Sequence, residues 1–258
     1  MATSKIIAII PARYASTRFP GKPLAMLGGK TVIQRVYEQV SKAIDNVLVA
    51  TDDERILNHV TIFGGKAVMT SNQHRSGTDR CREAYQKNGG NEDIIINVQG
   101  DEPFIHPEQI EALMSCFNDE NTDIATLVKP FDKHSNYEDL ENPNKVKVLL
   151  NSNMNAMYFS RSVIPHLRGI EKALWPGKHQ YYTHLGIYAY RAKVLEHITN
   201  LEPSSLEIAE SLEQLRWLEN GMTIKVGITQ HSSIGIDTPQ DLERAEQFLN
   251  KKTTDFSE

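Results

Sequence analysis

Residues 6–24 read IIAIIPARYASTRFPGKPL, and this stretch decides the fold class of the chain. Its first five residues are continuously apolar, which is typical of a strand buried on both faces of a parallel sheet. The residues that follow, 11–24, are called the cationic loop below: they contain Arg13, Arg18 and Lys22, and their prolines oppose helix formation. A buried strand that leads into such a loop indicates an anion site, and three clustered cations suit a nucleotide triphosphate.

A solvated turn is the alternative for each cation taken singly, because charged loop residues normally face water. The clustering favours the anion site. The loop differs from the dinucleotide fingerprint, since Gly21 is its only glycine. It also differs from the Walker pattern, since Pro23 follows Lys22 where Ser or Thr is required. Rossmann dehydrogenases and P-loop kinases are therefore disfavoured.

Short runs rich in Ile and Val alternate with longer segments of helical period along the chain. This pattern predicts an α/β fold with a doubly wound, mostly parallel sheet. In the first half, helices are expected to begin after Thr31 as N-cap, near Asp79 and near Pro107. The strands expected there lie near residues 6–10, 47–51, 67–70 and 94–99.

The pattern loosens after about residue 123. Residues 136–144 and 169–180 are predicted to be loops or excursions, and a helix is predicted over about 206–220. Further strands are expected at 124–128, 146–150, 156–159, 185–190 and 223–228, followed by a helix opened by Pro239. We expect one domain over 1–258, with an excursion at about 130–190 and a flexible tail at 251–258. The part of the excursion near 169–182 suits either a partner contact or a substrate lid.

Composition narrows the class of protein. The 258 residues carry a formal net charge of −5, which argues against bulk attraction to nucleic acid or an anionic membrane. Cys81 and Cys116 are too few for a disulfide framework and favour a reducing compartment. The sequence has neither a signal-peptide pattern nor an apolar run of membrane-spanning length, so we expect a cytoplasmic protein.

Two carboxylates are candidate metal ligands. Asp101 lies in NVQGDEP (97–103), just past a predicted buried strand, where ligands bind in open α/β sheets. Asp237 lies in GIDTP (235–239), between a predicted strand and a helix, so capping of that helix is the alternative role. If both approach one point, they form a hard-oxygen site that suits Mg²⁺.

Three further motifs are weaker signals on their own. HRSGTDR (74–80) enters a helix whose first amides suit an anion or a base edge, although Ser76 or Thr78 can simply cap that helix. His184 and Tyr188 have the even spacing that places both on one face of a strand, as a site or as an ordinary packed pair. Acidic residues with helical spacing, solvated or directed at sugar hydroxyls, are Glu207, Glu210 and Glu213.

Taken together, these motifs resemble the 3-deoxy-manno-octulosonate cytidylyltransferases, also called CMP-Kdo synthetases. The likeness covers almost the whole chain, through residues 9–18, 20–24, 76–78, 97–103, 159–161, 184–188, 212–216 and 237–239. It implies a nucleotide-diphospho-sugar transferase fold of the GT-A-like type. It also implies an enzyme that uses CTP and Mg²⁺ to activate 3-deoxy-D-manno-octulosonate (Kdo) for lipopolysaccharide synthesis, as a homodimer.

The resemblance also implies residue roles. The catalytic residues are Arg13, Lys22, Asp101 and Asp237, of which the two aspartates hold the metal. The nucleotide is bound by Pro11, Ala12, Arg13, Arg18, Lys22, Ser76, Gly77, Gln99 and Asp101. The sugar acid is bound by Gln99, Arg161, His184, Tyr188, Glu207 and Glu210, with Arg161 facing its carboxylate.

Departures from the family pattern leave alternatives open. Phe19 replaces a common aliphatic residue, Asp79 a common Glu, and Thr183 a common basic residue that would bear on the sugar side. The alternatives are a cytidylyltransferase for another sugar acid, such as 8-amino-Kdo or sialic acid, and a nucleotide-sensing domain without catalysis.

Overall fold

The computed structural model describes residues 4–232 and 234–255, with side chains described through residue 250. The chain divides into two compact units. The first unit comprises residues 1–110 together with the segment from 232 onward, and the second comprises Glu111–His231. Helix α4 (Pro107–Ser115) carries the chain from the first unit into the second.

The first unit contains a parallel sheet. Its strand order is β6-β1-β4-β5, and β1 pairs in parallel with both β4 and β6. Every residue of β4 and β6 is buried, as their continuous apolar sequences predict. The strands span Ile6–Ala12 (β1), Val47–Thr51 (β4), Ala67–Met69 (β5) and Ile94–Asn97 (β6), which confirms all four predicted strands.

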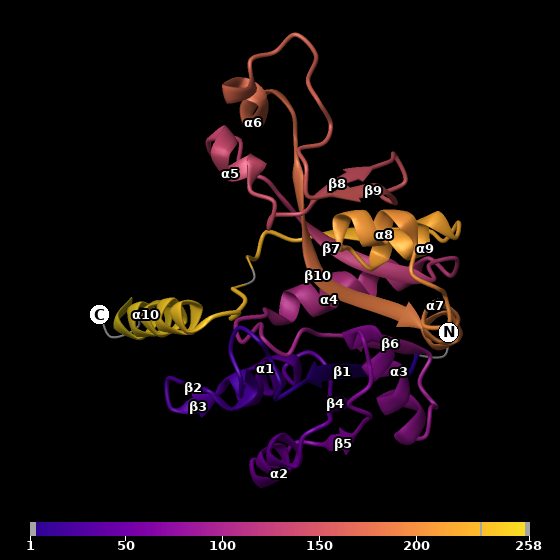
Figure 1. Cartoon of the computed structure of the whole chain (residues 1–258), viewed down its shortest axis with the longest axis vertical. Coiled ribbons are helices and arrows are strands. Elements are labelled where there is room, and N and C mark those ends of the chain that lie inside the picture. Colours follow the sequence, from indigo (N-terminus) through magenta and orange to yellow (C-terminus); the bar gives the residue numbers. More distant parts are fainter. Residues whose placement is uncertain (1–3, 233, 256–258) are drawn as a thin grey trace. The chain divides into compact units, whose positions relative to one another are not determined.

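Helices α1 (Val32–Val40) and α2 (Glu54–Ile62) connect β1 to β4 and β4 to β5, while α3 (Gly77–Lys87) carries the chain back to β6 (Figure 1). Right-handed crossovers in opposite directions place α1 and α2 on one face of the sheet and α3 on the other. The sheet is therefore doubly wound. The direction of winding reverses between β1 and β6, which makes the carboxyl edge of these two strands the expected ligand position.

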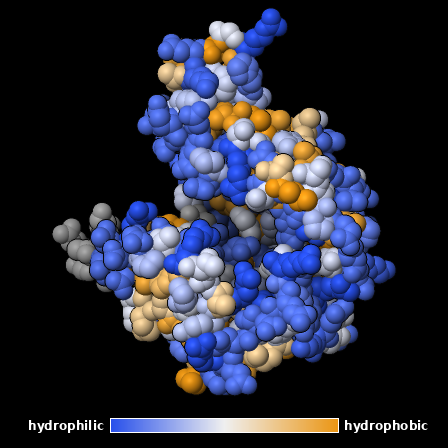
Figure 2. Space-filling model, viewed as in Figure 1, coloured by the Kyte–Doolittle hydropathy of each residue, from blue (hydrophilic) through white to orange (hydrophobic). Residues whose placement is uncertain are grey.

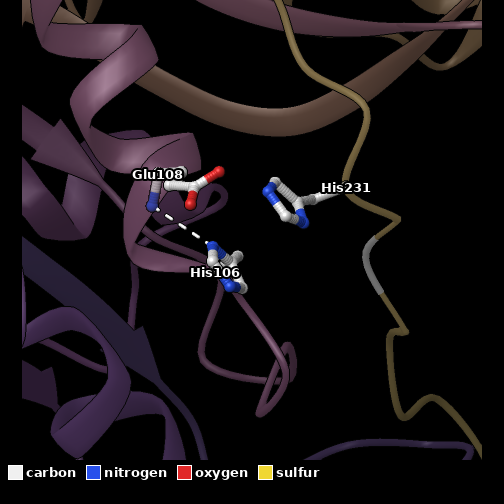
Figure 3. Close-up of side chains that lie close together, drawn as sticks. All are labelled: His106, Glu108 and His231. Atoms are coloured by element: carbon white, nitrogen blue, oxygen red, sulfur yellow. Dashed lines mark hydrogen bonds between the residues drawn. The ribbon is translucent and has the colours of Figure 1, made fainter.

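Side-chain caps fix where the helices begin. The Thr31 hydroxyl accepts a hydrogen bond from Gln34 N at 3.3 Å, which confirms the predicted N-cap of α1. α3 begins at Gly77, two residues before the predicted start, because Ser76 and Asp79 form a capping box. The turn before α4 is closed by His106, whose Nδ1 accepts a hydrogen bond from Glu108 N at 3.4 Å (Figure 3).

A small hairpin and the C-terminal helix complete the first unit. The 3₁₀ helix η1 (Lys22–Leu24) ends the cationic loop and leads into β2 (Met26–Leu27) and β3 (Lys30–Thr31). Helix α10 (Pro239–Asp255) packs on this region through a cluster of Leu27, Val32, Ile236 and Ala245. Residues 251–255 of the predicted tail are thus helical, and residues 256–258 lie outside the described part of the chain.

The second unit has a mixed sheet. Strand β7 (Ile124–Pro130) pairs in parallel with β11 (Ile224–Ile228) and antiparallel with β10 (Tyr182–Arg191). Strand β8 (Lys147–Leu150) pairs with β10 and, antiparallel, with β9 (Ala156–Ser160). The predicted strands are confirmed, and β10 begins three residues earlier than predicted.

Both stretches predicted to be loops or excursions contain short helices, which the prediction did not include. They hold α5 (Tyr137–Glu141) in the first and η3 (Lys172–Leu174) with α6 (Trp175–Lys178) in the second. The Asn136 side chain caps α5, and a local core of Phe131, Leu140, Trp175 and Tyr181 holds these segments together. The helices were not predicted because both segments are mostly polar and contribute few apolar residues to this core.

The one helix predicted over about 206–220 is wrong. It is divided into α8 (Ser205–Glu210) and α9 (Gln214–Glu219) by Ser211, which adopts a left-handed conformation with φ of 52°. The break redirects the chain so that α9 buries Leu215 and Trp217, whereas the residues of α8 stay at least partly exposed. Helix α7 (Ala192–Ile198) and η2 (Cys116–Asn118) complete this unit.

The face drawn in Figure 2 is mostly hydrophilic, with hydrophobic residues in scattered groups. Among the residues that the structure describes, no helix is long and apolar enough to cross a membrane.

Candidate active site

A cavity of about 410 Å³ opens in the first unit, where β1 and β6 end. The cationic loop, the start of α3, the residues after β6 and the segment before α10 all contribute to its wall. Every predicted nucleotide residue lines it: Pro11, Ala12, Arg13, Arg18, Lys22, Ser76, Gly77, Gln99 and Asp101, joined by Asp237. The fold thus brings these residues together, and their individual roles stay predictions.

Lys22 lies between the two candidate metal ligands. Its Nζ is 2.7 Å from Asp101 Oδ2 and 3.4 Å from Asp237 Oδ1. Arg18 Nη1 is 3.2 Å from the other oxygen of Asp237. Two carboxylates separated by 136 positions in the sequence (237 − 101) therefore meet at one ammonium group.

The local structure leaves the Asp237 carboxylate available for this contact. Ile236 N donates to Asp101 O at 2.9 Å, which ties the segment before α10 to the end of β6. The helix is capped by Thr238, whose hydroxyl accepts from Asp241 N at 3.2 Å, while Asp241 Oδ2 accepts from Thr238 N at 3.0 Å. Thr238, and not Asp237, therefore supplies the cap that was the alternative role of Asp237.

The donor set at this point fits Mg²⁺. Carboxylate oxygens are the protein ligands that this ion prefers, and it usually takes one or two of them together with water and phosphate oxygens. Asp101 and Asp237 supply that number, and both contact the ammonium of Lys22, which is itself a cation. The side chain of Asp237 is 51% exposed, so a bound ion has access to water.

Gly100 permits a close approach between the two strand ends. A Cβ at this position would lie 2.6 Å from the backbone oxygen of Pro11, which is too short for any side chain. Pro11 lines the cavity, so the absence of a side chain at Gly100 sets the distance between β1 and the loop that carries Asp101.

We therefore expect Gly100→Ala to lower the free energy of unfolding by about 2 kcal/mol, because the backbone must move to relieve the overlap. We also expect a higher KM for the nucleotide, since Pro11 and Asp101 are displaced. Thermal melting and steady-state kinetics measure both effects. Gly235→Ala is the matched control, because a Cβ there meets no atom within 4 Å. Equal stability of the two variants would contradict the prediction.

Sequence reasoning missed Arg80, which also lines the cavity. Its side chain is 1% exposed, with Nη2 2.9 Å from Asp52 Oδ2 and Nη1 2.6 Å from Thr70 Oγ1. These contacts fasten α3 to the ends of β4 and β5. The sequence did contain a signal for this residue. Arg80 lies four residues before the buried Ala84, on the apolar face of a predicted helix.

Among the predicted sugar residues, Gln99 lines the cavity of the first unit. The other five belong to the second unit. Two of these five meet directly: Glu210 Oε2 accepts from Arg161 N at 2.9 Å, and Arg161 Nε donates to Glu210 O at 2.7 Å. The Arg161 guanidinium also donates to the backbone oxygens of Pro143 and Ser211. Arg161 is thus held in one orientation with N–H donors to spare, since a guanidinium has five.

Glu207 has structural contacts. It forms a capping box with Ser204 at the start of α8. Both of its carboxylate oxygens also contact the Arg216 guanidinium, at 2.5 and 2.7 Å. These contacts are sufficient to explain the position of the Glu207 side chain. Its role in binding the sugar stays a prediction.

His184 and Tyr188 lie on one side of β10, as their spacing predicts, with ring centroids 5.3 Å apart. His184 Nε2 is 3.0 Å from Thr126 Oγ1, and that hydroxyl is 2.8 Å from the Ile187 carbonyl oxygen. The Thr126 hydroxyl therefore ties the His184 ring to the backbone of β10.

Burial lowers the pKa of His184 to about 3. The unfolded chain has a histidine pKa of about 6.5, so below this pH the unfolded state binds a proton that the folded state does not. We therefore expect His184 to contribute a loss of about 2 kcal/mol in the free energy of unfolding between pH 7 and pH 5. Urea titrations at both pH values measure the loss, and His184→Gln should reduce it. An identical pH dependence in this variant would contradict the prediction.

A doubly wound sheet whose switch point carries clustered cations and two convergent carboxylates suits an enzyme that binds a nucleotide triphosphate. Comparison with known proteins refines that class. A family model described as cytidylyltransferase matches residues 7–224. The 3-deoxy-manno-octulosonate cytidylyltransferase of Parabacteroides distasonis is 65% identical over 246 residues, covering 95% of this chain and 98% of that protein. The enzyme of the same name from Phocaeicola vulgatus is 64% identical over 96% of this chain and 98% of its own.

The structural comparison agrees. A CMP:2-keto-3-deoxy-manno-octonic acid synthetase, solved in complex with CTP, superimposes with a TM-score of 0.88 at 42% identity. The match covers 96% of this chain and all of that one. The chain belongs to the 3-deoxy-manno-octulosonate cytidylyltransferase family.

Proposed function

We propose that the protein transfers the CMP group of CTP to 3-deoxy-D-manno-octulosonate, which gives CMP-Kdo and pyrophosphate for lipopolysaccharide synthesis. The observation that carries this proposal is the meeting of Asp101 and Asp237 at Lys22, in a cavity lined by the cationic loop and the start of α3. Family membership supports the identity of both substrates.

Arg13 and Lys22 neutralise the triphosphate in this proposal, with Arg18 at the outer edge. Lys22 is suited to the inner position because its side chain is 14% exposed, whereas that of Arg18 is 67% exposed. The first amides of α3, beside Ser76 and Gly77, favour a negatively charged or acceptor group of the nucleotide. Pro11, Ala12 and Gln99 complete the nucleotide wall.

Asp101 and Asp237 would hold the Mg²⁺ ion. When bound, this ion supplies positive charge to the phosphate oxygens and lowers the pKa of a bound hydroxyl. Lys22 contacts both carboxylates, so its ammonium would leave at least one of them free for the ion and would then be available to the phosphates. The pair of aspartates thus keeps Lys22 at the reaction centre before the nucleotide arrives.

The anomeric hydroxyl of the sugar acid attacks the α-phosphorus in line with the leaving pyrophosphate. The new bond joins that oxygen to phosphorus, the bond to the β-phosphate oxygen breaks with its electron pair, and the hydroxyl proton leaves to solvent. The cations of the loop stabilise charge on the phosphate oxygens, so catalysis depends on position and electrostatics. The reaction proceeds without a covalent enzyme intermediate.

On the sugar side, we assign the carboxylate of the substrate to Arg161. Its fixed orientation against Glu210 suits bidentate recognition of a carboxylate. The imidazole of His184 and the hydroxyl of Tyr188 suit sugar hydroxyl groups. Thr183, in place of the common basic residue, leaves the 8-amino form of the sugar as the second candidate substrate.

The same proposal includes a cytoplasmic location and a homodimer. The reaction uses cytosolic CTP, and the two cysteines, Cys81 and Cys116, are both free and buried. Small-angle scattering at working concentration tests the dimer, and a monomer there would refute it.

Pyrophosphate release from CTP and Mg²⁺ tests the proposed reaction, with Kdo, 8-amino-Kdo and sialic acid offered separately. Release with Kdo supports the proposal. Release only with another acid keeps the mechanism and changes the sugar assignment. CTP binding without release with any of the three acids supports the alternative of a nucleotide-sensing domain.

A further inference from the structure

We infer that Arg55, at the start of α2, and Tyr14, in the cationic loop, are positioning residues for the triphosphate-binding cations. The inference rests on the proposed function, because it concerns the binding of CTP by that loop. Neither residue has a role in the nucleotide site described above.

Arg55 packs on the ring of Tyr14. The central guanidinium carbon of Arg55 is 3.3 Å from the centroid of the Tyr14 ring, which is a close cation–π contact. The guanidinium is fixed by Asp53, with Nε 2.9 Å from Oδ1 and Nη2 2.6 Å from Oδ2. Asp53 is in turn the N-cap of α2, accepting from Arg55 N at 2.9 Å. The planar group that contacts Tyr14 is therefore anchored to the end of a helix.

Tyr14 closes the cationic loop. Its backbone oxygen accepts a hydrogen bond from Gly21 N at 2.9 Å, which joins the beginning of the loop to its end. Gly21 has a φ of +72°, and a Cβ there would lie 3.1 Å from Cζ of the Tyr14 ring. Gly21 is also the N-cap of η1, whose first residue is Lys22. The backbone oxygen and the ring of Tyr14 therefore both lie against Gly21, the residue that precedes Lys22.

The first half of the loop needs an anchor of its own. Ion pairs with Asp101 and Asp237 hold Arg18 and Lys22, in the second half of the loop, whereas Arg13 in the first half is exposed. A loop that is already held in its binding conformation loses less entropy when the ligand arrives. The contact between Arg55 and Tyr14 supplies this order from outside the cavity.

Arg55 acts through contact and not through attraction to phosphate. Its charge is compensated by Asp53, both of whose carboxylate oxygens accept hydrogen bonds from the Arg55 guanidinium. Replacing Arg55 should therefore weaken CTP binding without changing how steeply binding depends on salt. Replacing Lys22 should reduce that salt dependence, because its charge faces the ligand.

The test compares Arg55→Met, Tyr14→Leu, the double variant and the conservative Tyr14→Phe. CTP affinity is measured by calorimetry, and KM and kcat by pyrophosphate release. We expect each single variant to weaken CTP binding and raise KM about two- to fivefold, the range of an exposed cation–π contact. We expect kcat to change less than about twofold, because the same phosphate contacts are lost from ground and transition states. Tyr14→Phe keeps the ring and should match the unaltered protein.

The double variant should bind CTP about as weakly as either single variant, because both remove one contact. Lys66→Met, an exposed cation of the first unit away from the loop, is the matched charge control. Melting temperatures check folding, and Arg55→Met replaces a side chain that is 58% exposed. Unchanged CTP affinity in Arg55→Met or Tyr14→Leu, or additive effects in the double variant, would overturn the inference. If the unaltered protein does not bind CTP, the proposed function fails with it; if it does and the variants bind equally well, only the inference fails.

Discussion

Asp101→Asn should lower kcat about a thousandfold while leaving the fold intact. The amide keeps the size of the side chain but removes one of the two carboxylate charges that meet at Lys22. A metal ion at a phosphoryl centre contributes several kcal/mol, and about 4 kcal/mol corresponds to a thousandfold change in rate. The loss of the partly exposed ion pair with Lys22 costs about 1 kcal/mol of stability or less.

A Mg²⁺ titration identifies the cause of that loss. If Asp101 binds the metal, the Mg²⁺ concentration for half-maximal activity rises in Asp101→Asn by about tenfold or more, since one charged ligand is gone. Asp45→Asn, at an exposed position of the first unit, is the matched control and should behave like the unaltered protein. Normal turnover in Asp101→Asn would exclude the metal role of this residue.

Lys22→Met should lower kcat/KM for CTP about a hundredfold. The variant keeps most of the aliphatic side chain but removes the ammonium that we assign to the triphosphate, whose loss from a partly buried site is worth about 3 kcal/mol. Lys30→Met is the control, because Lys30 makes an exposed ion pair with Glu38. Equal kinetics in the Lys22 and Lys30 variants would contradict the assignment.

The same variant should change metal binding in the opposite direction to Asp101→Asn. In the unliganded protein the Lys22 ammonium contacts both carboxylates and competes with the ion for them. Its removal leaves two like charges without that partner, so the half-saturating Mg²⁺ concentration should fall. A rise in that concentration would mean that Lys22 orders the carboxylates more than it competes for them.

The local sequence was sufficient for the elements around the nucleotide site. The apolar runs of β1, β4 and β6 are buried throughout or nearly so, and continuous runs of this kind are stable only inside a covered sheet. The capping residues Thr31 and Ser76 are adjacent to the helices that they begin. Such signals can be recognised in the sequence because the residues that produce each element lie within it or next to it.

Where the prediction was wrong or incomplete, the deciding contacts are distant in sequence. The helices α5 and α6 depend on a small core that joins Phe131, Leu140, Trp175 and Tyr181. The break at Ser211 depends on the burial of Leu215 and Trp217 by α9. Neither effect produces a recognisable pattern in the local sequence, because the residues that pack together come from separate segments of the second unit.

The candidate site divides in the same way. Arg13, Arg18 and Lys22 stand together in one loop, so the chemistry available at the end of β1 can be read from the chain alone. The three-dimensional fold was needed to find that Asp237 joins Asp101 at Lys22, and that Arg80 and Arg55 support this region from α3 and α2. Aspartates that are distant in the chain come together here because parallel strands end at one edge of the sheet, and strand order is set by the packing of the whole unit.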